Sequence, residues 1–81
     1  MMTADSAAIL TQVTETIARM GNLNGLAPDQ DFYEAGITSI MALPILLDLE
    51  DVFQVSIPDD RFIAARTPLA LADLIASLRE Q

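Results

Sequence analysis

Eight consecutive nonpolar residues, from Ile40 to Leu47, place the strongest constraint on the fold. Apolar residues continue at helical spacing as far as Phe53, so we expect one helix over about residues 40–53. At about 3.6 residues per turn, eight residues go more than twice around a helix, and the core of a small domain takes only one side. Part of the run is therefore expected to be exposed or used by a partner.

The helix over residues 40–53 divides into a core side and an outer side. Ile45, Leu46, Leu49 and Phe53 make one coherent core stripe. Leu43 either joins the outer side or packs under the preceding loop. We expect the outer side to be a partner surface, apolar at its centre and flanked by acids. The predicted partner surface consists of Met41, Pro44, Leu47, Glu50 and Asp51.

Three further helices follow from periodicity and capping. A first helix is expected from about Asp5 or Ser6 to Met20, with Thr16 on its outer side. A short helix is expected after Pro58, and a last helix begins at Thr67 as N-cap. The fold class is therefore all-α, a four-helix bundle of three longer helices and one short one in a single domain over residues 1–81. The expected inner face of the first helix consists of Ile9, Leu10, Val13, Ile17 and Met20.

The residue types that most often build reactive sites are absent, because the 81-residue chain has no cysteine and no histidine. Their absence excludes disulfides, thiolate nucleophiles, Ser-His relays and the commonest zinc ligands, so we expect neither an enzyme nor a metal site. No stretch approaches the length of a membrane span, and residues 1–9 lack the pattern of a signal peptide. The sequence predicts a soluble, cytoplasmic, monomeric protein whose chemistry is supplied from outside.

Negative charge dominates the middle of the chain. The formal net charge is −8, and no basic residue lies between Arg19 and Arg61. Such a field repels nucleic acid and anionic lipid and raises encounter rates with basic protein surfaces. We therefore expect basic protein partners, with neither nucleic acid nor membrane; the alternative is that the charge only serves solubility. The acids of this interval are Asp29, Asp31, Glu34, Asp48, Glu50, Asp51, Asp59 and Asp60.

A loop meets the central helix at residues 31–40, and one serine lies at the junction. Gly36 gives the backbone freedom that a tight turn needs. Ser39 stands directly before the apolar run, where a helix N-cap belongs, although Thr38 can take that place instead. Unpaired N–H groups and the helix dipole favour negative charge at a helix start, so a phosphodiester on Ser39 would be well placed.

Residues 32–40, Phe-Tyr-Glu-Ala-Gly-Ile-Thr-Ser-Ile, resemble the attachment motif of acyl and peptidyl carrier proteins. In that family Gly-x-Asp-Ser-Leu or Gly-x-His-Ser-Leu presents a serine for 4′-phosphopantetheine, and Ser39 matches that serine. The resemblance continues through residues 49–53, 56–60 and 67–75, so it covers most of the chain.

The resemblance implies that a phosphopantetheinyl transferase uses coenzyme A and Mg²⁺ to load Ser39 with the 4′-phosphopantetheine arm. The terminal thiol of the arm then holds an acyl or aminoacyl thioester. Further implied partners are an acyl- or aminoacyl-loading ligase and downstream synthase or transferase enzymes. The cofactor-binding motif around Ser39 would consist of Gly36, Ile37, Thr38 and Ile40.

Two positions depart from the family pattern. Thr38 stands where the family usually has Asp or His, and Pro44 falls inside the second helix. Members that serve fatty acid synthesis usually have acids early in this helix, whereas this chain has Met41 and Pro44. The Asp-Phe-Tyr-Glu approach to Gly36 looks more like peptidyl carriers. We predict a stand-alone carrier with fatty acyl, polyketide or aminoacyl cargo. The alternative is an unmodified acidic helical module that binds basic partners through residues 41–47.

Overall fold

The computed structural model describes the backbone of residues 4–80 and the side chains of residues 6–80. This part of the chain forms four helices and no strand: α1 spans Ala4–Met20, α2 spans Ser39–Phe53, α3 spans Asp59–Ala64 and α4 spans Pro68–Arg79. The prediction of an all-α bundle with three longer helices and one short helix is confirmed. Residues 1–3, part of the segment tested above for a signal peptide, lie outside the described residues.

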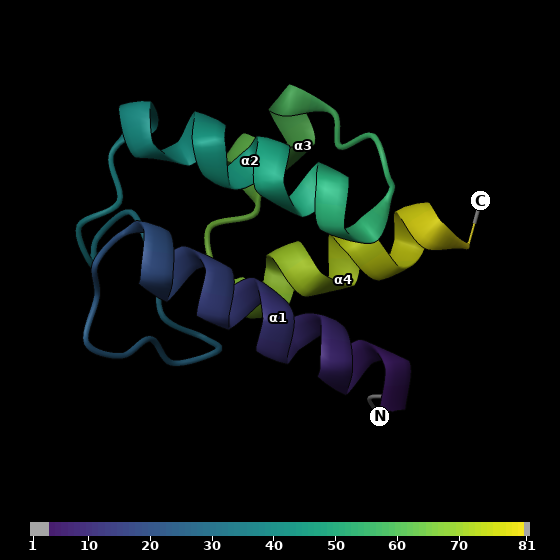
Figure 1. The fold of residues 1–81 in the computed structure, drawn as a ribbon, viewed down its shortest axis with the longest axis horizontal. Helices are drawn as coiled ribbons and strands as arrows, with labels where there is room; N and C mark the ends of the chain where they lie inside the picture. Colours follow the sequence, from purple (N-terminus) through teal and green to yellow (C-terminus); the bar gives the residue numbers. More distant parts are fainter. Residues whose placement is uncertain (1–3, 81) are drawn as a thin grey trace.

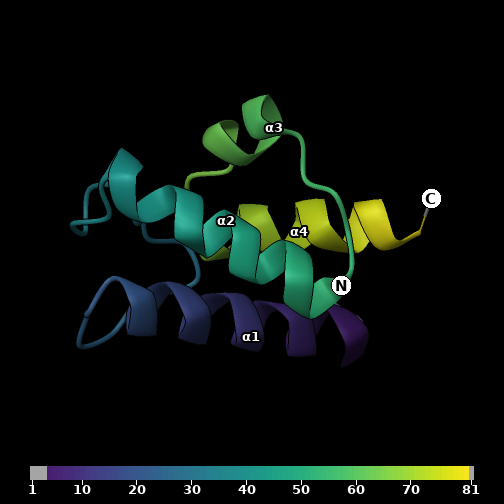
Figure 2. The same ribbon diagram turned by 45° about the horizontal axis from the view of Figure 1, so that its top comes forward.

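The three longer helices surround one core. Helix α1 packs against α4 and α2 (Figure 1), whereas α3 lies on the side of the bundle away from α1 (Figure 2). The start of α1 and the end of α4 lie at one end of the bundle, and the start of α2 lies at the other (Figure 1). The junction around residue 39 therefore lies far from the start of α1 and from the end of α4. The largest fully buried side chains include Ile17, Phe32, Ile45, Leu49, Leu71 and Ile75.

Helix α1 buries the expected face, with one correction. Ile9, Val13 and Ile17 are buried, and Leu10 and Met20 pack against the core. The placement of Thr16 on the outer side is wrong, because this residue is 0% exposed, and its hydroxyl has no hydrogen-bond partner among the described residues. Threonine has nearly the shape of valine, so its methyl group suits an apolar site even though burying the hydroxyl costs free energy.

Helix α2 has the predicted core stripe. Ile45, Leu46 and Leu49 are buried, and Phe53 packs against the core. Pro44 lies inside the helix, which runs without interruption from Ser39 to Phe53. The missing N–H of a proline costs less near a helix start than deep inside. The helix therefore keeps its apolar side in the core despite the proline.

Packing at the end of α1 fixes the loop that leads to α2. A Cβ atom at Gly21 would overlap the side chain of Ile37, so only glycine permits this approach. Asn22 then takes a left-handed conformation with φ of 55°, as residues that end helices often do. Ile37 is thereby held in the core two residues before Ser39.

Candidate functional site

A tight turn brings the chain from the loop into α2. The Asp31 carboxylate accepts hydrogen bonds from the backbone N–H groups of Tyr33, at 2.9 Å, and Glu34, at 3.2 Å. The N–H of Gly36 donates to the Tyr33 carbonyl at 3.2 Å, and Gly36 has φ of 127°. Side-chain-bearing residues rarely adopt that backbone conformation, so glycine is needed at this position. These bonds join residues that are close together in the sequence.

Thr38, and not Ser39, is the N-cap of α2. The Thr38 hydroxyl accepts a hydrogen bond from the Met41 N–H at 3.3 Å, and its carbonyl accepts from Ala42 at 2.9 Å. This result decides between the two caps that the sequence allowed. Ser39 is the first residue of the helix and is exposed. No hydrogen bond occupies its hydroxyl within the described part of the chain, so that hydroxyl is available for modification.

The start of α2 suits an anion. Its first turn contains no acidic residue, although carboxylates are favourable at such a place because the helix dipole is positive there. The first N–H groups of a helix also lack intrahelical partners, and Thr38 satisfies one of them. A phosphodiester on Ser39 would meet both the dipole and the remaining N–H groups, so these residues fit the group that the resemblance implies.

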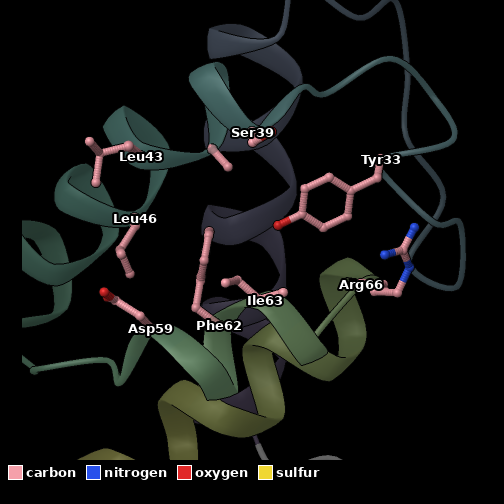
Figure 3. Close-up of a pocket in the computed structure, with 9 residues that line it drawn as sticks. Tyr33, Ser39, Leu43, Leu46, Asp59, Phe62, Ile63 and Arg66 are labelled. Carbon is pink, nitrogen blue, oxygen red and sulfur yellow. The ribbon is translucent and has the colours of Figure 1, made fainter.

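A pocket of about 360 Å³ opens beside Ser39, between α2 and α3 (Figure 3). Most of its lining is apolar, and three polar side chains besides Ser39 stand at its edges. The sequence predicted a short helix after Pro58 but did not predict this pocket. The adjacent pair Phe62 and Ile63 was the available signal, because two successive apolar residues on a short helix face different sides. The lining residues are Tyr33, Ser39, Ala42, Leu43, Leu46, Asp59, Phe62, Ile63 and Arg66.

Arg66, from the linker between α3 and α4, ties the turn in place. Its Nε donates to the Asp31 carboxylate at 2.6 Å, and its guanidinium carbon lies 4.9 Å from the centroid of the Tyr33 ring. Its carbonyl accepts from the Phe32 N–H at 3.0 Å. The acidic centre of the chain is therefore partly paired, and a second ion pair joins Arg19 to Asp48 at 3.7 Å.

The pKa values of Asp31, Tyr33 and Arg66 are shifted from their ordinary values. The hydrogen bond from Arg66 is the main reason that the pKa of Asp31 lies below its ordinary value, and the same bond raises the pKa of Arg66. Burial raises the pKa of the Tyr33 phenol. Asp31 is therefore charged and paired at neutral pH, while Tyr33 is a neutral phenol able to donate a hydrogen bond.

We expect Asp31→Asn to lower the free energy of unfolding at neutral pH. In this variant the free energy of unfolding should also fall less steeply as the solution is made acidic. The folded pKa of Asp31 lies below the ordinary 3.8. Its contribution is therefore complete above the unfolded pKa and is lost as pH falls through the lower folded value. Denaturant unfolding followed by circular dichroism at a series of acid pH values measures this. Asp29→Asn, in the same loop, is the matched control and should follow the wild-type curve. Coincident curves for the two variants would contradict the prediction.

The predicted partner surface is exposed only in part. Of its five residues, Pro44, Leu47 and Asp51 are exposed, Leu47 to 56%. Ile40 and Leu43, which the predicted surface did not include, are 87% and 58% exposed. We call Ile40, Leu43, Pro44, Leu47 and Asp51 the exposed stripe. These five residues follow one another at helical spacing along α2.

Two members of the predicted partner surface are placed differently from the expectation. Met41 is not at the rim, because it is partly buried and packs against the core. Glu50 is not a free surface acid: its carboxylate accepts the Ile57 N–H at 2.8 Å and so holds the loop between α2 and α3. Seven residues separate the two groups along the chain, so helical periodicity did not indicate this contact.

The helical bundle leaves an exposed serine at a helix start beside an apolar pocket, an arrangement suited to a group attached to that serine. A family model described as the phosphopantetheine attachment site matches residues 8–75 of the chain. The chain belongs to this family. Its members carry a covalently attached 4′-phosphopantetheine and are cargo carriers, not catalysts. The resemblance, the cofactor and the carrier class are therefore confirmed.

One relative shows where such units occur. The chain is 36% identical over 72 residues to the hybrid PKS-NRPS synthetase pynA of Aspergillus niger. The match covers 88% of this chain and 2% of that synthetase. Within the described residues, no helix is long and apolar enough to cross a membrane, and no group of side chains is suited to holding a metal ion.

Proposed function

We propose that Ser39 carries the 4′-phosphopantetheine arm and that the protein holds acyl or aminoacyl cargo as a thioester at the end of it. The observation that supports this most directly is the exposed Ser39 hydroxyl at the start of α2, where no acidic side chain offsets the helix dipole. The hydroxyl is free because Thr38 makes the cap. In the loading step the Ser39 oxygen forms a phosphodiester as the pyrophosphate bond of coenzyme A breaks and adenosine bisphosphate leaves.

The proposal extends to the way the carrier works. We propose that the chain acts as a separate monomeric unit in the cytoplasm. Its single hydrophobic core supports the first part of this proposal, because a unit with its own core can fold by itself. Its partners would be a phosphopantetheinyl transferase, a loading ligase and downstream synthase or transferase enzymes. Gly36, Ile37 and Thr38 would set the position of Ser39 through the turn, the core and the cap, and Ile40 would meet the partner.

Mass analysis of the intact protein tests the proposal. The chain is incubated with coenzyme A, Mg²⁺ and a broad-specificity transferase, and we expect a gain of one phosphopantetheinyl mass. A protein that stays unmodified while a known carrier is loaded in the same tube would support the second candidate, an unmodified interaction module. The exposed stripe is the observation that favours that candidate, because three large apolar side chains gather on one helix face.

We expect association with a partner enzyme to weaken as salt rises, and Asp51→Lys to slow it several-fold. Asp51 is exposed at the end of the exposed stripe, and charges separated by more than about 8–10 Å are screened near physiological ionic strength. Asp73→Lys, an exposed position on α4, makes the same change in net charge away from the stripe. Stopped-flow association rates at several salt concentrations measure both variants. Equal slowing in the two would show that only net charge acts.

A further inference from the structure

Tyr33 contacts two neighbouring side chains at the edge of the pocket beside Ser39. The centroid of the Tyr33 ring lies 4.8 Å from that of the Phe32 ring. The guanidinium carbon of Arg66 lies 4.9 Å from the Tyr33 ring centroid. Arg66 is itself fixed by the bond to Asp31. The Tyr33 ring is therefore positioned by an aromatic contact and by a cation–π contact with a paired arginine.

The Tyr33 hydroxyl points into this pocket, between Ser39 and the α3 side chains (Figure 3). Among the described residues, no protein group forms a hydrogen bond with that hydroxyl. The surrounding wall is largely apolar, with Leu46 and Phe62 at the bottom. A lone hydroxyl in such a wall recognises a ligand that offers one polar group among carbon segments.

The charges around the pocket favour a neutral ligand. The Arg66 charge is paired with Asp31, which weakens its attraction for an anion in the pocket. Asp59 lines the opposite side and would repel a carboxylate. The pantetheine arm has this chemistry, since its neutral amides are separated by short carbon segments. The arm also begins at Ser39, which lines the pocket itself, so it enters without a separate binding event.

We propose that the Tyr33 hydroxyl donates a hydrogen bond to an amide carbonyl of the phosphopantetheine arm folded back into this pocket, with Arg66 as the positioning residue for the Tyr33 ring. This inference rests on the proposed function. It assigns to Tyr33 the holding of the arm between transfers, and it predicts that the pocket accepts neutral groups in preference to carboxylated ones.

The test uses the loaded protein with an isotope-labelled arm and two hydroxyl deletions. Tyr33→Phe removes the hydroxyl and keeps the ring, whereas Thr11→Val removes an exposed hydroxyl from α1, which does not line the pocket. We expect both variants to be loaded fully. The amide resonances of the arm should shift toward those of free pantetheine in Tyr33→Phe and stay at wild-type positions in Thr11→Val. Arg66→Gln should give part of the Tyr33→Phe shift.

A second readout comes from Tyr33 itself, because the chain has one tyrosine and no tryptophan. Donation to the arm stabilises the protonated phenol, so the tyrosinate absorbance should titrate at higher pH in the loaded protein than in the unloaded one. Full loading with identical arm resonances in wild type and Tyr33→Phe would overturn the inference and leave the proposed function intact. A wild-type protein that gains no mass would overturn both.

Discussion

Ser39→Ala abolishes loading: we expect no phosphopantetheinyl mass on this variant under conditions that load wild type completely. The reason is chemical, since the side-chain oxygen that would form the phosphodiester is gone. Intact-mass measurement after incubation with coenzyme A and transferase reads the result directly. Modification that persists in Ser39→Ala would place the attachment at another residue and defeat the assignment of Ser39.

The variant is also a clean control for folding. Thr38 makes the N-cap bond to Met41, so Ser39→Ala removes no cap. Surface substitutions usually change stability by about 0.5 kcal/mol or less, and we expect this one to fall in that range. Ser77→Ala, at an exposed serine of α4, should load like wild type. A variant that both unfolds and fails to load would require the assay to be repeated with Ser39→Asn, which also lacks a hydroxyl.

Periodicity along the chain predicted most of the fold. The core faces of α1 and α2 follow from apolar spacing, because burial of one helix face is what such spacing records. The burial of Thr16 was not predicted. A polar residue whose shape fits the core interrupts the apolar pattern in the sequence but still packs well in the structure. The choice between Thr38 and Ser39 as cap depended on backbone angles, and neighbouring hydroxyls look alike in a sequence.

The site was less predictable than the helices. The motif pointed to Ser39, but the pocket beside it needs α3, and its polar edge needs Arg66. Arg66 and Asp31 are 35 residues apart, and no periodicity joins positions in two separate loops. The sequence showed Asp31 only as one of the acids between Arg19 and Arg61, whereas the structure pairs it with Arg66. Glu50 shows the same limit, because helical periodicity does not indicate the bond between its carboxylate and the Ile57 N–H.

The exposed stripe gives the second large effect. We expect Leu47→Glu to leave the free energy of unfolding within about 0.5 kcal/mol of wild type and to slow loading by a partner enzyme roughly tenfold. Leu47 is 56% exposed, so a carboxylate there stays in water. An enzyme that acts on Ser39 must dock near the start of α2, where a buried charge would be unpaired.

Leu46→Ala is the matched control variant, because Leu46 is adjacent to Leu47 in the sequence and is buried. Truncating a core leucine typically costs about 2–5 kcal/mol, so this variant should lose stability where Leu47→Glu loses partner recognition. Chemical denaturation and initial loading rates, measured on both proteins, separate the two effects. Leu47→Glu with wild-type loading rates would remove the exposed stripe as a docking surface. A stability loss in Leu47→Glu as large as that of Leu46→Ala would instead place Leu47 in the core and leave α2 without an outward apolar face.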